Sequence, residues 1–217
     1  YQCFIFDIQH PNCPPRRQAE AGINPIKVSG DYTEWPAVIN GLMQDYTIEI
    51  IFSFPPCTDL AVSGAAHFAK KLMVDPLYRD KAMDMVYFAG NIAYGYDLPC
   101  MIENPVSVIS SEWRKPDYTF HPYEYGGYLP ADDESPYDLI PAHDAYTKKT
   151  CLWVKNGHRV EFHMPEKRPV ELPTDYKYSP QHLKLGGKSI KTKNIRSATP
   201  RGFAIAIWQA NREGNIS

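Results

Sequence analysis

The chain has 217 residues, of which 43% are hydrophobic, and its formal net charge at pH 7 is −2. This length suits one domain with at most a small appendage, and the hydrophobic content is sufficient for a sizeable core. A charge so close to zero gives by itself no reason to expect a polyanionic partner, and no apolar run approaches the ~18–20 residues of a membrane span, so we expect no membrane partner.

Hydrophobic patterning predicts alternating strands and helices in the first half of the chain and mostly irregular structure in the second. In chain order, we expect a strand over 2–8, a loop over 9–27, a short strand end over 28–31, a helix over 35–43, a strand over 48–54, a loop or broken helix over 58–75, a helix over 76–94 and a strand over 99–103. Irregular structure over 110–145, a strand over 149–154, further irregular structure over 160–196 and a helix over 200–211 follow.

This order of elements predicts an α/β fold with a parallel, doubly wound sheet. The run 48–54 is rich in Ile and Phe, which suits a strand that is covered on both faces. In such sheets the carboxyl ends of the strands are where ligands and chemistry collect. Candidate functional residues are therefore sought at the ends of these strands.

Cysteine usage favours a reducing compartment. The five cysteines stand at positions 3, 13, 57, 100 and 151, and none forms a CxxC pair. Neither a zinc site nor a disulfide framework is therefore supported, and no metal is expected. Since no signal peptide is visible either, the expected location is the cytoplasm.

The charges are unevenly distributed along the second half of the chain. Residues 184–201 carry six Lys or Arg and no acid, whereas residues 128–146 carry five Asp or Glu and no Lys or Arg. A basic strip of this kind can neutralise phosphates, and a solvated loop is the alternative. The basic residues are Lys184, Lys188, Lys191, Lys193, Arg196 and Arg201, and the acidic residues are Asp132, Asp133, Glu134, Asp138 and Asp144.

Two of the predicted strands lead into reactive side chains. The segment 50–57 reads Ile-Ile-Phe-Ser-Phe-Pro-Pro-Cys and ends at Cys57, and the segment 100–105 reads Cys-Met-Ile-Glu-Asn-Pro and contains Glu103. The two prolines stiffen the backbone and remove amide donors, so they hold the thiol at the edge of the sheet. A glutamate after apolar residues suits a buried acid with a raised pKa. Together they suggest a nucleophile with an acid partner, and a structural, well-packed cysteine is the alternative.

Phe54–Cys57 and Glu103–Pro105 resemble motifs four and six of the DNA (cytosine-5) methyltransferases. The segments Cys57–Ala65, Glu103–Ser110 and Arg114–Asp117 are similar to those of the short, phage-type variants. The resemblance runs in motif order from about residue 3 to residue 211. It implies an α/β fold with a doubly wound, Rossmann-like methyltransferase sheet and a small, loop-rich C-terminal extension. It also implies S-adenosylmethionine as cofactor, double-stranded DNA as partner, a monomer, and a bacterial cell or phage-infected host as the setting.

In that family a cysteine attacks carbon 6 of a flipped-out cytosine, and a glutamate contacts ring nitrogen 3. The resemblance therefore implies that Cys57 and Glu103 are catalytic. Carbon 5 is a poor nucleophile until a thiolate adds to carbon 6, and the base must leave the stack to be reached. The segment 58–75 resembles the loop that closes over the flipped base, and an ordinary connector is the alternative.

The resemblance also assigns three substrate-binding residues. Asn104 belongs to the same motif as Glu103. Lys148 and Thr150 stand where the family has the two arginines of Gln-x-Arg-x-Arg, so the pair of cations expected around the cytosine is only partly present.

Four residues are assigned to the cofactor by the same resemblance. Asp7 resembles the acid that binds the ribose, and Asp31 resembles the acid at the adenine end. Pro55 belongs to motif four, and Ser197 belongs to the last motif, beside the methionine end of the pocket. A cap, a turn or a surface charge is the alternative for Asp7, Asp31 and Ser197, and also for Lys148 and Thr150.

The expected organisation is a methyltransferase core over 1–154 that lacks its first strand, a loop-rich DNA-contacting region over 155–195, and a C-terminal helix over 196–217 that returns to the core. The family's first motif, a strand and a Phe-x-Gly turn, should precede Asp7 by roughly twenty residues and is not in the sequence. Either the chain is truncated or the protein is a degenerate relative. The leading interpretation is a DNA cytosine methyltransferase; a catalytically incomplete DNA-binding relative and an enzyme acting on a free pyrimidine nucleotide are the alternatives.

Overall fold

In the computed structural model the chain divides into two compact units, residues 1–48 and 49–217. The structure describes residues 4–6, 26–28, 35–137, 139–158, 160–174, 192, 195–196 and 198–212. In the first unit, strand β1 (Phe4–Phe6) pairs in parallel with β2 (Ile26–Val28). Helix α1 (Trp35–Asp45) follows and confirms the predicted helix over 35–43. β2 begins inside the predicted loop 9–27, so the short strand lies earlier than expected.

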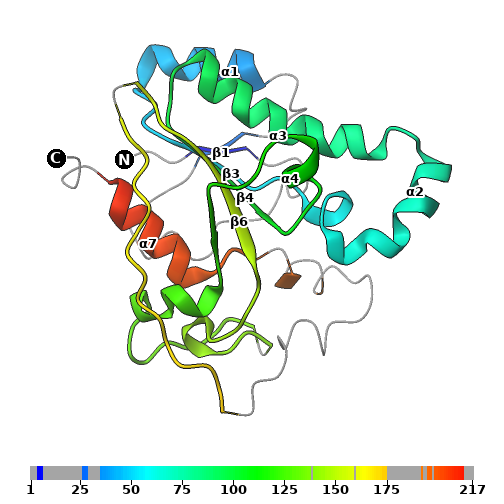
Figure 1. Cartoon of the computed structure of the whole chain (residues 1–217). Helices are drawn as coiled ribbons and strands as arrows, with labels where there is room; N and C mark the ends of the chain where they lie inside the picture. Colours follow the sequence, from blue (N-terminus) through cyan, green and yellow to red (C-terminus); the bar gives the residue numbers. More distant parts are fainter. Residues whose placement is uncertain are drawn as a thin grey trace. The chain divides into compact units, whose positions relative to one another are not determined.

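The second unit contains a four-stranded sheet with the order β3-β4-β6-β5 (Figure 1). β3 (Ile51–Ser53) and β4 (Cys100–Pro105) are parallel, as predicted for the strands over 48–54 and 99–103. β6 (Thr150–Lys155) runs antiparallel to β4, and β5 (Tyr118–Phe120) runs antiparallel to β6. The sheet is therefore mixed rather than wholly parallel, in keeping with the short helical turns, and no long crossover helix, among the described residues between β4 and β6.

Helices pack on both faces of this sheet, which makes the second unit a mixed α/β structure (Figure 1). Successive residues of a strand face opposite sides, so Cys100 and Ile102 contact α3 (Tyr78–Gly95), whereas Met101 lies in the aromatic cluster around α7 (Arg201–Asn211). In that cluster the rings of Phe120 and Phe203 stack with centroids 4.0 Å apart. α3 and α7 confirm the helices predicted over 76–94 and 200–211.

The segment between β3 and α3 forms a broken helix, as predicted for residues 58–75. It consists of η2 (Cys57–Asp59), η3 (Val62–His67) and α2 (Phe68–Val74). Lys71 of α2 reaches back to Asp59 at 2.5 Å and to the Thr58 carbonyl at 3.0 Å. These contacts tie α2 to the first turn after the strand.

The stretch predicted to be irregular over 110–145 consists mostly of short turns. Sequence patterning missed β5, because three residues are too few to show a period of two. The other elements in and beside this stretch are α4 (Ile109–Glu112), η4 (Pro122–Tyr128) and η5 (Ala142–Asp144).

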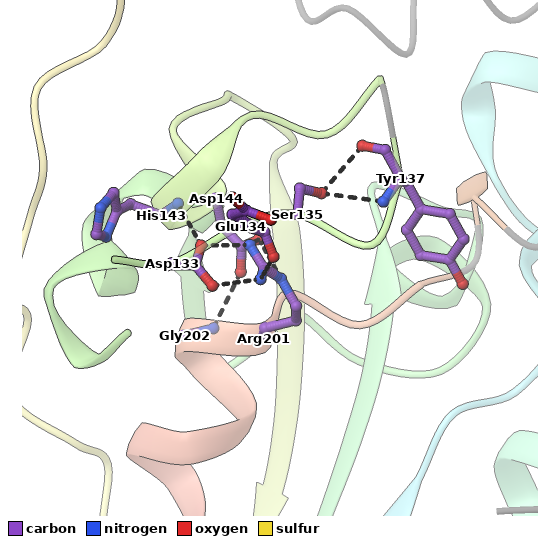
Figure 2. A network of polar contacts seen from close by, with 8 residues as sticks. All are labelled: Asp133, Glu134, Ser135, Tyr137, His143, Asp144, Arg201 and Gly202. Atoms are coloured by element: carbon purple, nitrogen blue, oxygen red, sulfur yellow. Dashed lines mark hydrogen bonds and ion pairs between the residues drawn. The ribbon is translucent and has the colours of Figure 1, made fainter. Parts of the chain in front are cut away.

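A polar clamp formed by Asp133, Asp144, Arg201 and Gly202 attaches the start of α7 to the turns after β5 (Figure 2). The guanidinium of Arg201 donates to both carboxylate oxygens of Asp133, at 2.6 and 2.9 Å, and also to Asp144. The second oxygen of Asp144 accepts from the Gly202 amide at 3.0 Å. The acidic stretch and the basic strip of the sequence therefore meet here, so Arg201 is paired within the chain instead of being available for phosphate.

None of the helices that the structure describes combines the length and the hydropathy needed to cross a membrane. Cys57, Cys100 and Cys151 are free thiols. Within the same described residues, no three His, Cys, Asp or Glu side chains are grouped as a metal site would require.

Candidate active site

The parallel strands β3 and β4 bring Cys57 and Glu103 into one site. The chain leaves β3 at Ser53, passes through the two prolines, and opens the 3-10 turn η2 with Cys57. Glu103 lies in the last half of β4, where it is opposite Leu152 of β6. The two groups are close enough for the Glu103 carboxylate to raise the pKa of the Cys57 thiol. The sequence-predicted pair is thus assembled by the ends of two neighbouring strands.

Asn104 links the two strand ends directly. It is buried, and its Nδ2 donates to the carbonyl oxygen of Pro55 at 2.9 Å. Proline has no amide hydrogen, so the backbone of Pro55 can form hydrogen bonds only through its carbonyl oxygen. Asn104, predicted to bind substrate, therefore also holds the Pro-Pro segment against the end of β4.

A second connection forms just beyond the site. Ala61 and Ser107 form an isolated antiparallel bridge. On one side the Val62 amide donates to the Val106 carbonyl at 3.0 Å, and on the other the Val108 amide donates to the Leu60 carbonyl at 3.0 Å. The backbone on both sides of the nucleophile is thus hydrogen-bonded to the β4 segment, which limits the movement of Cys57 relative to Glu103.

The Cys57 thiol is half-buried, and its surroundings shift its pKa in both directions. Burial raises its pKa most strongly, the Lys148 ammonium lowers it, Glu103 raises it, and the Arg196 guanidinium lowers it. The net direction is upward from the ordinary value of 9.0, so the resting thiol is protonated at neutral pH. A nucleophile in this state needs a change in its surroundings before it reacts as thiolate.

The Glu103 side chain is buried, with 8% of its surface exposed. Burial raises its pKa, and Lys148 partly opposes that shift. Its Oε1 has no hydrogen-bond partner among the described residues, and the same is true of Asn104 Oδ1 and Ser107 Oγ. Buried polar atoms are nearly always paired, so three unpaired ones at the end of one strand indicate a place where a polar ligand would be bound.

Thr150 is the first residue of β6, and Lys148 precedes it by two positions and has different surroundings. The charge of Lys148 acts on both Cys57 and Glu103, and its contact with substrate stays a prediction. Thr150 is fully buried and its Oγ1 donates to the Lys148 carbonyl at 3.0 Å. The threonine thus supports the backbone that carries the lysine, and its contact with substrate stays a prediction.

Sequence reasoning did not assign Arg196 to this site. The carbonyl oxygen of Arg196 accepts from Lys148 Nζ at 3.0 Å, and its guanidinium is one of the charges that act on Cys57. The basic strip 184–201 contained this residue but could not distinguish it from its neighbours. The contact with Lys148 is what sets it apart.

The structure describes one of the four predicted cofactor-binding residues. Asp7, Asp31 and Ser197 lie outside the described residues. Pro55 is buried at the site, and its carbonyl is occupied by Asn104. Binding of S-adenosylmethionine by these four positions therefore remains a prediction.

Comparisons of the chain with protein-family models, curated proteins and solved structures find no match. Any functional assignment therefore depends on the motifs in the sequence and on the geometry of this site.

Proposed function

We propose that the protein transfers a methyl group from S-adenosylmethionine to carbon 5 of cytosine in double-stranded DNA, through addition of the Cys57 thiolate to carbon 6 of a flipped base. One observation carries the proposal. A thiol and a buried acid of raised pKa lie at the ends of two parallel strands, in the motif order of the DNA cytosine-5 methyltransferases, and a lysine just before the antiparallel strand β6 acts on both.

The chemistry explains why these groups belong together. Thiolate addition to carbon 6 pushes electron density toward ring nitrogen 3, so a hydrogen-bond donor at that nitrogen stabilises the developing charge. A carboxyl group whose pKa is raised by burial is protonated over a wider pH range and can serve as that donor. Lys148 favours the thiolate at the same time, since its charge lowers the pKa of Cys57. Carbon 5 then becomes nucleophilic, and the cofactor, when bound, supplies an electrophilic methyl group. Loss of the carbon 5 proton then breaks the bond between carbon 6 and sulfur, which releases the Cys57 thiolate and restores the aromatic base.

The proposal includes a finer assignment of the fold. β3 and β4 would be neighbouring strands of a doubly wound, Rossmann-like methyltransferase sheet, and the broken helix 57–74 would be the loop that covers the flipped base. The parallel β3-β4 pair and the helices on both faces are compatible with this assignment.

Two reactions test the nucleophile and the complete transfer separately. Addition to carbon 6 makes carbon 5 exchange its hydrogen with solvent, so a duplex carrying 5-tritiated cytosine should release tritium without any cofactor. A duplex carrying 5-fluorocytosine should form a covalent adduct when S-adenosylmethionine is present. Cys57→Ala should abolish both signals, and Cys100→Ala, which removes a buried thiol at the opposite end of β4 from Asn104, should retain both.

The alternatives give different results in the same assays. An adduct that persists in the Cys57→Ala protein refutes the role of the thiol. Duplex binding without tritium release or adduct indicates the catalytically incomplete relative. Tritium release from free cytidine nucleotide, and none from duplex, indicates an enzyme acting on a free pyrimidine.

A further inference from the structure

Helix α2 is attached to the second unit without a buried side chain of its own. A helix of seven residues is too short to be stable in isolation, so its position depends on contacts with the residues around it. The apolar side chains at its end contribute little to those contacts, because Leu72, Met73 and Val74 are 55%, 87% and 80% exposed. The polar side chains of α2 therefore have an unusually large share in holding it.

Lys71 makes the contacts that join α2 to the turn carrying the nucleophile. Its Nζ donates to the Thr58 carbonyl oxygen at 3.0 Å and to Asp59 Oδ1 at 2.5 Å. Thr58 and Asp59 are the two residues that directly follow Cys57 in the 3-10 turn η2. An ammonium has three donors, so one lysine can hold a backbone carbonyl and a carboxylate at once.

The other side of Lys71 is supported by a chain of contacts that leads to the second strand of the site. Its Nζ lies 5.9 Å from the centroid of the Tyr78 ring, at the start of α3. The Tyr78 hydroxyl accepts from Arg79 Nη2 at 3.0 Å, and Arg79 Nη1 pairs with Glu112 at 3.3 Å. Glu112 belongs to α4, the first helix after β4. Lys71 is thus placed between the turn after β3 and the helix after β4.

We propose that Lys71 is a positioning residue for Cys57. By holding Thr58 and Asp59 it keeps the turn η2, and the thiol that begins it, in the half-buried position beside the end of β4. This role does not depend on the reaction that Cys57 performs, whereas an effect of Lys71 on turnover rests on the proposed function.

The sign of the expected change separates positioning from a simple effect of charge. Burial is the largest cause of the raised pKa of the Cys57 thiol. A turn released by the loss of Lys71 would expose the thiol, so its pKa would fall toward the ordinary value of 9.0 and more thiolate would be present at pH 8. The loss of a nearby positive charge acts in the opposite direction, because it raises the pKa of a thiol and slows its reactions.

Alkylation by iodoacetamide at pH 8 measures this release. The peptides of Cys57 and of the buried Cys100 are followed by mass spectrometry in the same digest, so that Cys100 reports loosening of the whole unit. Lys71→Met should accelerate modification of Cys57 roughly threefold or more and leave Cys100 unchanged. Lys71→Arg, which keeps the charge and the donors, should stay within about twofold of wild type. Lys70→Met, which removes the neighbouring exposed charge of α2, should change neither rate.

The outcomes distinguish this role from the proposed function. An unchanged or slower rate at Cys57 in Lys71→Met overturns the proposal, and so does an equal acceleration at Cys100. If urea unfolding shows that Lys71→Met is not folded, Lys71→Gln takes its place with the same expected acceleration. Tritium release from duplex should fall several-fold in the variant that shows the acceleration. The alkylation pattern in a chain whose wild type releases no tritium supports the role of Lys71 and refutes the proposed function.

Discussion

Replacing Glu103 by glutamine should stabilise the protein at neutral pH while it impairs the proposed chemistry. The carboxyl group is buried, and its Oε1 has no partner among the described residues, so ionisation in the folded state is costly. An unpaired buried polar group costs about 1–3 kcal/mol, and a charged one at least as much. Glutamine keeps the shape of the side chain and cannot ionise.

The sign of the pH dependence follows from the direction of the pKa shift. The folded-state pKa of Glu103 is raised above its ordinary value of 4.5, so the protonated form favours the folded state. The stability that this proton contributes is fully present below 4.5 and is lost as the pH rises through the raised folded-state value. The variant should therefore match the wild-type chain at low pH and exceed its free energy of unfolding by about 1–3 kcal/mol at high pH.

Urea unfolding of both proteins at a series of pH values measures this difference. For a domain of this size, a gain of 1–3 kcal/mol corresponds to a rise in Tm of about 2–12 °C. Comparing the two proteins at each pH cancels the titration of the other carboxylates. Tritium release should fall at least about a hundredfold in Glu103→Gln, since a general acid contributes that much or more. A stability difference that does not change with pH, or a variant less stable than wild type at pH 8, would refute the reasoning.

Two further substitutions test how the site and the second unit are held together. Asn104→Ala removes the hydrogen bond to the Pro55 carbonyl. It should lower the free energy of unfolding measured in urea by about 1–2 kcal/mol and should slow tritium release. Unchanged values would show that this hydrogen bond does not position the nucleophile. Gly202→Ala places a Cβ against the Tyr125 carbonyl oxygen and should cost about 1–3 kcal/mol. Gly41→Ala, where nothing lies nearby, should be neutral or stabilise by up to about 1 kcal/mol; equal effects at both glycines would contradict the packing argument.

Much of the fold of the second unit could be predicted because its main elements carry strong local signals. α3 follows a proline and has apolar residues at helical spacing, and β4 begins with the apolar residues Cys100, Met101 and Ile102. The mixed order of the sheet could not be predicted, since the direction of β6 depends on how the long irregular connection returns. The clamp on Arg201 was present in the sequence only as an acidic stretch and a basic strip, whose pairing depends on folding.

In the candidate site, too, residues with a local sequence signal could be predicted, and residues placed by long-range packing could not. Cys57 could be found because it follows an apolar strand and two prolines, and Glu103 because it interrupts an apolar run two residues before a proline. Both are local patterns that imply a position near the end of a strand. Arg196 could not be found, because its place near the thiol depends on Ile195 packing against Tyr146 from a distant part of the chain. The complete burial of Thr150 could not be predicted either, because only the register of the sheet determines which way its side chain faces.

The charges in the site couple the two groups that the proposed reaction uses. Ionised Glu103 raises the pKa of Cys57, so forming the thiolate is easiest while the carboxyl keeps its proton. Lys148 lowers the pKa of both groups, and burial raises both, so the pair favours a single negative charge over two. Addition to a cytosine requires the state in which Cys57 is the thiolate and Glu103 is protonated. In that state the base can receive an electron pair at carbon 6 and a hydrogen bond at nitrogen 3 at the same time. The cations therefore serve the reaction best if they favour ionisation of the thiol over ionisation of the acid. Arg196 acts in that direction, since its charge lowers the pKa of Cys57.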